Sequence, residues 1–483
     1  MKKLGNILYC IFSALFILLP LLILSKSDYK LSRMEHYSAC YFIVFAVAAA
    51  GILFFLFTKF EKYPDWLLAS VPAGLSVVFR YLCYKLVGPY MVMKYDYLTA
   101  LESARGVYAS KEALFTAWGF YPRVLEAWFR ITGSDSYGCA VAFNILVSAV
   151  SVVLIYFVGH KLTDDKRVGL AAALLFGLWP SYGFYVSITS TEHLAIMNYL
   201  IASLLLISAW QSQGKKRWIY VCAAGISAGV CDCFKEFTPV FVIAALAAGF
   251  VFWLIRKGDG KKLLSLVIAI VLIFGLSSGT HSLALKYLET YLGQPVAQSA
   301  TGHFLWVGLN SSSGGMWSNE VGMKVYELAE EYDNDYDRVN AELMAMLKAD
   351  LAEHPESLRP TVEHKMEVDW AADTGVFDWV RSLYTGDHIP KKDWIYMGSG
   401  AYYMALIFFM LVGAVFAFAE KNKKPEAMYF RLVCFGYALL FILSEAQGRY
   451  QMVLFPFFTL LAADGAKNGA EALKRLLHRQ EKA

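Results

Sequence analysis

The residues best suited to chemistry in this chain stand in short turns between long apolar segments. A carboxylate in such a turn can accept a proton, and a lysine or arginine beside it can neutralise an anion. Charged side chains at membrane depth are costly and usually line a cavity or a substrate path, although short turns also need polar residues to stay hydrated. The residues are Asp96 in MKYDYLTALE, Glu192 and His193 in SITSTEH, Lys235 and Glu236 in CDCFKEF, and Glu445, Gln447 and Arg449 in SEAQGRY.

The composition indicates that these turns belong to a membrane protein. Of 483 residues, 58% are hydrophobic and 17% are charged, whereas a soluble protein carries roughly a quarter charged residues. Apolar runs of about 20 residues, long enough to cross a bilayer, recur along the chain. We therefore predict an all-α polytopic membrane protein with about twelve transmembrane helices. The predicted spans are 7–24, 40–57, 66–84, 138–158, 168–186, 192–210, 217–233, 237–255, 263–282, 398–418, 428–444 and 449–465.

Basic residues alternate along the linkers between these spans. Five linkers hold 15 Lys and Arg, whereas the short turns between them hold only Lys235 and Arg449. Because cytoplasmic loops carry an excess of Lys and Arg, both termini and the basic linkers are predicted to be cytoplasmic. The long loops 85–137 and 283–397 then face outward, together with the short turns.

This topology predicts five parts of the chain. The predicted parts are an extra N-terminal transmembrane hairpin (1–62), a transmembrane core that includes the first outer loop (63–282), an outer helical loop region (283–397), C-terminal transmembrane helices (398–466) and a basic cytoplasmic tail (467–483).

The first outer loop is predicted to form two interfacial helices. After Asp96, small and apolar residues recur at helical spacing on one stripe, and polar residues point away from it. A second amphipathic stretch follows in GFYPRVLEAWFRITG (119–133). Amphipathic helices of this kind lie in the headgroup plane, although they also pack as ordinary helices on an outer domain. The stripe consists of Tyr97, Ala100, Leu101, Ala104 and Tyr108.

The second outer loop opens with a glycine- and serine-rich aromatic stretch, HFLWVGLNSSSGGMW (303–317). Backbone amides in such a turn can cradle an anion, and Trp306 or Trp317 can stack on a sugar ring. A plain flexible turn fits the composition equally well. Helical patterns follow at 320–332, 335–353 and 356–381, so the loop is predicted to be mostly helical.

Neither a metal site nor a nucleic-acid surface is indicated. The eight cysteines lie in or beside apolar runs without zinc-ligand spacing, and they are interpreted as small buried hydrophobes. The net charge of +4 forms no basic patch interleaved with aromatic residues.

Several stretches resemble the GT-C glycosyltransferase superfamily, and within it the bacterial relatives of the dolichyl-phosphate-mannose protein mannosyltransferases. The resemblance implies a GT-C fold and an enzyme that moves a sugar from a polyprenyl-phosphate carrier to an envelope acceptor at the outer face of the membrane. The acceptor is a glycan, a lipid or a protein. The stretches are YDYLTALESARG (95–106), GFYPRVLEAWFRITG (119–133), FNILVSAVSVVLIYFVGHKL (143–162), LFGLWPSYGFYVSITSTEH (175–193), GISAGVCDCFKEFTPVF (225–241) and EAQGRYQMVLFPFFTLLAA (445–463).

The same resemblance assigns roles to residues. Asp96 matches the acidic residue of the first loop, which is the expected general base. Relatives often place two acidic residues together there, whereas Asp96 stands alone until Glu102; no cofactor is therefore assigned, and a divalent metal is left open. The predicted substrate-binding residues are Tyr97, Glu102, Arg105, Tyr121, Arg123, Glu192, His193, Lys235, Glu236, Asn310, Trp317, Glu445, Gln447, Arg449 and Tyr450.

Two other classes of protein fit the sequence. A transporter or flippase of lipid-linked sugars also has about twelve helices with inner termini, but it often shows pseudo-symmetric halves. The two halves of this chain, 1–240 and 241–483, share no pattern. An envelope polymer ligase is the other alternative.

Overall fold

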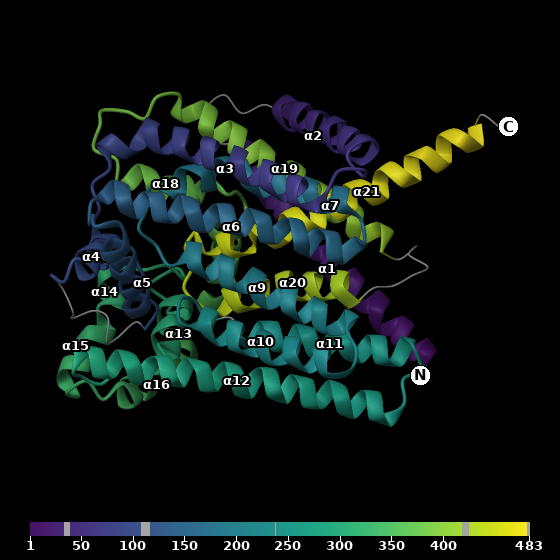
Figure 1. Cartoon of the computed structure of the whole chain (residues 1–483). Helices are drawn as coiled ribbons and strands as arrows, with labels where there is room; N and C mark the ends of the chain where they lie inside the picture. Colours follow the sequence, from purple (N-terminus) through teal and green to yellow (C-terminus); the bar gives the residue numbers. More distant parts are fainter. Residues whose placement is uncertain (33–38, 108–115, 237, 418–424, 481–483) are drawn as a thin grey trace.

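The computed structural model describes the chain except residues 33–38, 108–115, 237, 418–424 and 481–483. Every named element in the described part is helical, and an isolated bridge joins Met91 to Tyr384. The long helices run side by side, and several short helices gather at one end of the bundle (Figure 1). The predicted all-α class is therefore confirmed.

Eleven long helices and the shorter α7 form the body of the bundle in the described part of the chain. In chain order they are α1 (Lys2–Ser32), α2 (Ala39–Lys59), α3 (Asp65–Val87), α6 (Tyr137–Thr163), α7 (Lys166–Gly177), α9 (Glu192–Gln211), α10 (Gly214–Asp232), α11 (Thr238–Ile255), α12 (Gly260–Leu292), α19 (Lys392–Phe416), α20 (Pro425–Leu443) and α21 (Phe455–Gln480).

Eight helices in the described part are long and apolar enough to cross a membrane, and the total of twelve spans stays a prediction. The predicted span 168–186 is broken, because α7 ends at Gly177 and α8 (Pro180–Tyr185) begins after Trp179. Pro180 suits the first position of the new helix because its missing N–H would have no helical partner there. The span 449–465 likewise begins as the 3-10 helix η3 (Tyr450–Leu454) before α21.

The helices of the two outer loops lie at one end of the bundle. They are η1 (Gly88–Tyr90), α4 (Tyr95–Ala104) and α5 (Thr116–Thr132) in the first outer loop, and α13 (Thr301–Leu309), α14 (Asn319–Gly322), α15 (Lys324–Glu331), α16 (Tyr336–Glu353), η2 (Pro355–Ser357), α17 (Leu358–Trp370) and α18 (Thr374–Ser382) in the second. Both loops are helical, as predicted. The second is shorter than expected, because α12 continues past residue 282 to Leu292 and ends at Gly293 in the left-handed conformation (φ 68°).

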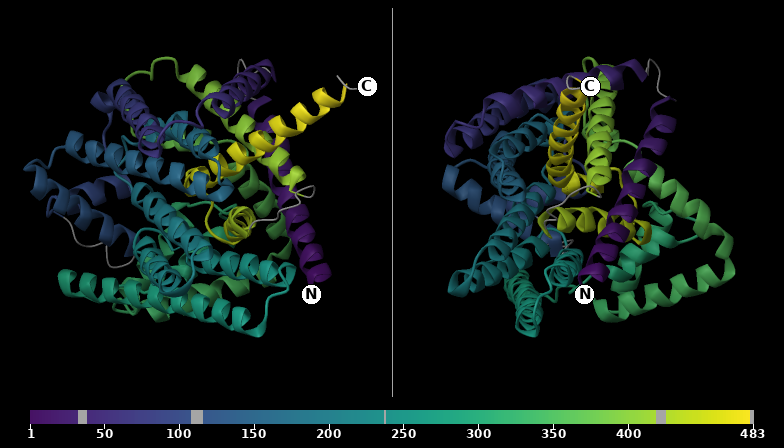
Figure 2. Two further views of the ribbon diagram at one scale, coloured as in Figure 1. Left: turned by 45° about the vertical axis from the view of Figure 1, so that its right-hand side comes forward. Right: turned by 90° about the vertical axis from the view of Figure 1, so that its right-hand side faces the viewer.

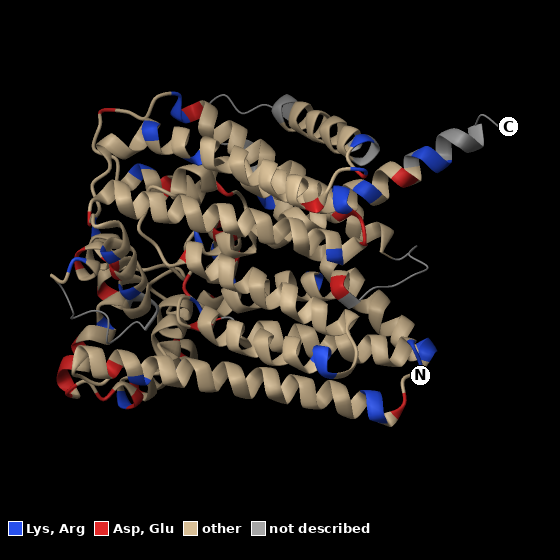
Figure 3. Ribbon diagram, in the orientation of Figure 1, with Lys and Arg blue, Asp and Glu red and all other residues tan. Residues whose placement is uncertain are grey.

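Charged residues lie mainly at the two ends of the bundle. Lys and Arg lie at both ends, and acidic residues gather around α15 and α16 at the end opposite the chain termini (Figure 3). The last turns of α21 extend beyond the neighbouring helices on the side of the termini (Figure 2). The direction in which this bundle crosses a membrane stays a prediction.

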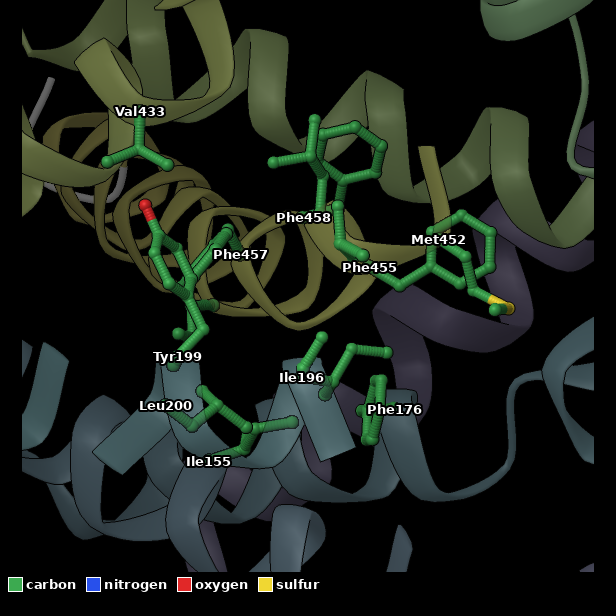
Figure 4. Close-up of a cluster of buried hydrophobic side chains, with 14 of the residues drawn as sticks. Ile155, Phe176, Ile196, Tyr199, Leu200, Val433, Met452, Phe455, Phe457 and Phe458 are labelled. Carbon is green, nitrogen blue, oxygen red and sulfur yellow. The ribbon is translucent and has the colours of Figure 1, made fainter. Parts of the chain in front are cut away.

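The main core lies where α6, α7, α9, α20 and α21 meet. Figure 4 shows aliphatic and aromatic side chains from these helices, including Ile155, Tyr199 and Phe457, packed together. Apolar lipid offers little hydrophobic driving force between helices, so close van der Waals packing holds such a bundle together. At the α19–α21 crossing, a Cβ on Gly465 would clash with the carbonyl oxygen of Phe409, so only glycine permits this approach.

The second outer loop has a hydrophobic core of its own. Its buried members come from α13 to α16, and partly buried tyrosines pack around them. The buried members are Trp306, Val307, Leu309, Val321, Val325, Leu328, Ala329, Val339, Leu343 and Leu347.

Candidate active site

Three short turns bring one carboxylate and two cations together at the end of the bundle that carries the outer loops. Glu192 begins α9 and is fully buried, Lys235 lies between α10 and α11, and Arg449 directly precedes η3. Lys235 Nζ is 3.4 Å from Glu192 Oε1, and Arg449 Nη1 is 3.7 Å from the same oxygen. Three of the predicted site residues, far apart in sequence, therefore form one cluster.

Aromatic rings surround the two cations. The Arg449 guanidinium lies 4.9 Å from the ring centroid of Trp379, 5.2 Å from that of Tyr97 and 5.5 Å from that of Tyr450. Lys235 Nζ lies 4.7 Å from the Tyr450 centroid. Arg449 also donates hydrogen bonds to the Tyr97 hydroxyl and to Gln447 Oε1. The rings keep both cations partly desolvated, which strengthens their attraction for an anion.

Burial changes the acid–base properties of this cluster. Burial lowers the pKa of Lys235, and the nearby carboxylate of Glu192 opposes that change. Burial raises the pKa of Glu445, and hydrogen bonds from Gln447 and Tyr450 together with the charge of Arg449 oppose it. Glu445 therefore accepts hydrogen bonds from Gln447 and Tyr450 of its own turn and lies close to the cationic Arg449.

The turn between α20 and η3 is held by the second outer loop. The backbone N–H of Glu445 donates to the carbonyl of Phe304 (3.1 Å), and that of Ala446 donates to Gly315 (2.8 Å). Gly448 packs against Gly375 at the start of α18, where a Cβ on either residue would lie within 3 Å of the other backbone. The outer helices therefore set the position of Arg449.

Lys365 of α17 adds a further support to the same turn. Its ammonium group is buried and donates to the carbonyl oxygens of Gly308 (3.0 Å) and Ile442 (2.7 Å). A cation at the C-terminus of α20 is favoured because the last carbonyls of a helix carry partial negative charge.

Asp96 lies in the first turn of α4, as predicted, and is half-buried. The described part of the predicted stripe, Tyr97, Ala100, Leu101 and Ala104, is buried, and Tyr108 falls outside the described residues. Burial, and then the charge of Asp96, raise the pKa of Tyr326 in α15. Tyr97 contacts Arg449, and its backbone carbonyl accepts a hydrogen bond from Thr189 (2.8 Å). The first turn of α4 thus borders the charged cluster.

Three other predicted site residues have partners within the first outer loop. Arg105 pairs with Glu102 (2.8 Å) and donates to the carbonyl of Asp135. Arg123 donates to Ser103 Oγ (2.8 Å) and to the Ser103 carbonyl, which joins α5 to α4. These contacts hold α4 and α5 together, and a role in substrate binding stays a prediction.

Tyr121 and His193 lie beneath the turn that carries Glu192. The Tyr121 hydroxyl donates to Asn144 Oδ1 (3.3 Å), and Asn144 Nδ2 in turn donates to the carbonyls of Val186 and Ile188, both at 2.9 Å. His193 is fully buried, with Nδ1 3.1 Å from the Tyr182 hydroxyl. Both residues therefore shape the turn from within. Glu236, beside Lys235, is exposed.

Side chains of the protein itself accept hydrogen bonds from the glycine- and serine-rich turn. Asn310 Oδ1 accepts hydrogen bonds from the backbone N–H and the hydroxyl of Ser312 (3.0 and 2.7 Å), and Asp350 accepts two from Ser311 (2.8 and 2.6 Å). These amides are therefore engaged within the protein rather than open to an anion. Trp317 is 38% exposed, and its ring lies 5.5 Å from that of His303.

The structure adds residues that sequence reasoning missed. Trp379 of α18 covers Arg449, and Ser190 donates to Glu192 Oε2. Ser190 stands two residues before Glu192, and this spacing, typical of a serine turn, was an available signal. Nothing local marks Trp379, because its role depends on how α18 packs on the bundle.

A bound divalent metal stays an open prediction. Among the described residues, no three His, Cys, Asp or Glu side chains lie close enough together to hold one.

Residues 111–278 match the family described as dolichyl-phosphate-mannose-protein mannosyltransferase. This stretch contains Glu192 and Lys235, whereas Asp96 and Arg449 lie outside it. No curated protein matches the sequence. The match confirms the predicted resemblance and supports a multi-pass membrane glycosyltransferase of the GT-C type as the class of protein.

Two crystal structures of the Archaeoglobus fulgidus oligosaccharyltransferase align with the chain. One, tethered through a disulfide bond to an acceptor peptide with the NVT sequon, is 13% identical with a TM-score of 0.34, over 85% of this chain and 56% of that one. The other, a complex with zinc and sulfate, is 10% identical with a TM-score of 0.31, over 83% and 53%. This chain thus spans little more than half the length of those proteins.

Proposed function

We propose that this protein transfers a sugar from a polyprenyl-phosphate donor to a hydroxyl group of an envelope acceptor (a glycan, a lipid or a protein). The observation that carries the proposal is the convergence of Lys235 and Arg449 on Glu192 at the end of an apolar helical bundle. The family match over residues 111–278 supports it independently.

Lys235 and Arg449 bind the phosphate of the donor. When the bond between the anomeric carbon and the phosphate oxygen breaks, its electron pair leaves with the phosphate, and negative charge grows there. Cations held in a desolvated site stabilise that charge in the transition state more than in the ground state. Arginine also matches the geometry of phosphate oxygens with two parallel hydrogen bonds. Without donor, Glu192 balances part of the positive charge and keeps both side chains in place.

Asp96 accepts the proton of the acceptor hydroxyl as the oxygen forms its bond to the anomeric carbon. A general base has to lie within about 3 Å of that oxygen in the reacting complex. The first turn of α4 suits this role, because a carboxylate there is stabilised as an anion by the helix N-terminus. Tyr97, the next residue, accepts a hydrogen bond from Arg449, which connects the helix turn of the base to the phosphate site.

The reaction is proposed to take place at the outer face, with both termini in the cytoplasm. Single-cysteine labelling in a cysteine-free background tests this orientation. A cysteine at Glu330 of α15 should react with an impermeant thiol reagent in intact cells. Labelling only after the membrane is breached would contradict the orientation.

Reconstitution with a synthetic polyprenyl-phosphate sugar tests the function. The purified protein should transfer the sugar to envelope acceptors, and transfer should fall in Lys235→Ala and Arg449→Ala proteins. Movement of the intact donor across the vesicle membrane without any transfer would instead identify a flippase. Near-normal transfer by both variants would remove the phosphate role.

A further inference from the structure

A buried carboxylate outside the charged cluster joins the second outer loop to the broken helix. Asp373 is fully buried directly before α18, and its Oδ2 accepts three hydrogen bonds. The donors are Trp179 Nε1 (2.8 Å), Ser181 Oγ (2.7 Å) and Ser399 Oγ (2.6 Å). Two donors stand at the start of α8 and one stands in α19, so one oxygen ties three elements together.

The helix that follows Asp373 reaches the charged cluster. Asp373 occupies the N-cap position of α18 (Thr374–Ser382), and Trp379 of this helix lies 4.9 Å from the Arg449 guanidinium. The same ring packs edge-on against Tyr97, with centroids 5.8 Å apart. On the other side, α8 leads through residues 186–191 to Glu192. Asp373 therefore connects the elements that carry both sides of the site.

The far end of α18 is fixed by the first outer loop. The backbone N–H of Val92 donates to the carbonyl of Leu383, and that of Thr385 donates to Tyr90, both at 2.9 Å. With this end attached near α4, the carboxylate of Asp373 determines how the other end sits on the bundle.

We infer that Asp373 is a positioning residue for the donor site, which holds α18 so that Trp379 stays over Arg449. The inference rests on the proposed function for the identity of the ligand. Removing the carboxylate leaves three buried donors without an acceptor. A small shift of α18 away from α8 and α19 would relieve this loss. Because one oxygen accepts all three hydrogen bonds, a single side chain provides this attachment.

Binding of a polyprenyl-phosphate sugar by the full-length protein in lipid nanodiscs tests the inference. Asp373→Ala should weaken donor affinity about tenfold, whereas Asp373→Asn, which keeps an acceptor oxygen, should stay near wild type. Ser399→Ala removes one donor and gives a milder variant if Asp373→Ala fails to fold. Loss of transfer in Asp373→Asn with donor affinity intact would point to acid–base chemistry and overturn a positioning role.

Asp165 provides a matched control. It is also a buried carboxylate, and it caps α7, the other half of the broken helix, where it pairs with Arg167 and Lys467. Asp165→Ala should lower stability without changing donor affinity. An equal loss of affinity in both alanine variants would show that any buried carboxylate has this effect, and would overturn the inference.

A double-mutant cycle with Trp379→Ala identifies the route of the effect. If Asp373 acts through Trp379, the double variant should bind donor no more weakly than the weaker single variant. Additive losses would contradict that route.

Hydrogen exchange separates this inference from the proposed function. Asp373→Ala should speed exchange in residues 374–382 and 444–450, and Asp165→Ala should not. If the wild-type protein fails to bind the donor, the proposed function fails, and hydrogen exchange alone decides the inference. Unchanged exchange in Asp373→Ala would overturn it.

Discussion

Two buried clusters in this chain each hold one carboxylate between two cations, and they differ in how closely the charges meet. Asp165, near the end of the bundle that carries the chain termini, lies 2.9 Å from Arg167 Nη2 and 3.1 Å from Lys467 Nζ. Glu192, at the opposite end, lies 3.4 Å from Lys235 Nζ and 3.7 Å from Arg449 Nη1. The first distances are those of hydrogen bonds, and the second exceed or border that range.

The Asp165 cluster is satisfied from within the protein. Asp165 Oδ1 also accepts the backbone N–H of Arg167 (2.9 Å) and caps α7. Burial alone would raise the pKa of Asp165, but hydrogen bonds from Arg167 and the charge of Lys467 lower it to about 2. This cluster ties α7 to α21 and leaves little capacity for a ligand.

The Glu192 cluster keeps its cations available. Within the described part of the chain, Glu192 Oε1 receives no hydrogen bond, and Lys235 and Arg449 lie against aromatic rings. A cation at a longer distance from its carboxylate partner loses less interaction energy when it binds an incoming anion instead. We therefore expect the closely paired cluster to have a structural role and the loosely paired cluster to bind an anion.

The largest expected effect comes from Arg449, and Arg167 of the other cluster provides the comparison. Arg449→Ala should lose about 3 kcal/mol or more of transition-state stabilisation, because it removes a cation from the developing phosphate charge. Arg167→Ala should leave transfer nearly unchanged in folded protein. Turnover of the two purified variants checks this, and equal losses would remove the distinction between the clusters.

Asp96→Asn should reduce transfer by roughly a hundredfold or more while donor binding stays largely intact. The amide keeps the shape of the side chain but cannot accept the proton. Turnover and donor affinity measured on one sample check this. A purely helix-capping role predicts lower stability, by about 1 kcal/mol, with catalysis spared.

Asp165→Ala should lower the free energy of unfolding by about 1 kcal/mol through loss of the α7 cap. Because its folded pKa lies below the unfolded value of 3.8, the wild-type contribution is present above pH 4 and is lost as the pH falls towards about 2. Denaturation of wild type and variant between pH 7 and pH 3 should show the difference shrinking. A constant difference would contradict the assigned ion pairs.

The smallest effect concerns Lys365, which supports the turn that holds Arg449. Burial lowers its pKa to about 8, with Asp369 and Glu445 opposing, so the folded state binds fewer protons than the unfolded state above that pH. Stability should therefore rise between pH 8 and about 10 relative to a Lys365→Met variant. A flat difference between the two proteins across this range would show that the ammonium is not desolvated.

The sequence predicted the elements better than it predicted their ends. Apolar runs located the helices because burial in lipid requires them, and the amphipathic stripe beginning at Tyr97 located α4. The break between α7 and α8 was missed, since residues 168–186 read as one continuous apolar run despite Pro180. The end of α12 was missed because its apolar pattern continues to Leu288 after the lipid-length stretch is complete.

The site residues, like the helices, were predicted in part from the sequence. Glu192, Lys235 and Arg449 stood out because polar residues are scarce in their turns, and the structure brings them together. Asn310 was expected at a ligand turn, but its side chain completes a local hydrogen-bond pattern that spacing alone does not reveal. Trp379 and Asp373 were missed because their importance arises from packing between segments far apart in sequence.

The separate core of the second outer loop has a consequence for how such a protein diversifies. Helices α14 to α16 bury their apolar side chains against one another and against α13, whereas α17 and α18 attach to the membrane bundle. A segment with an independent core can exchange its surface residues, or be replaced as a unit, while the attachments of α17 and α18 stay in place. Under the proposed function, variation in α14 to α16 is therefore a route by which one donor site could serve different acceptors.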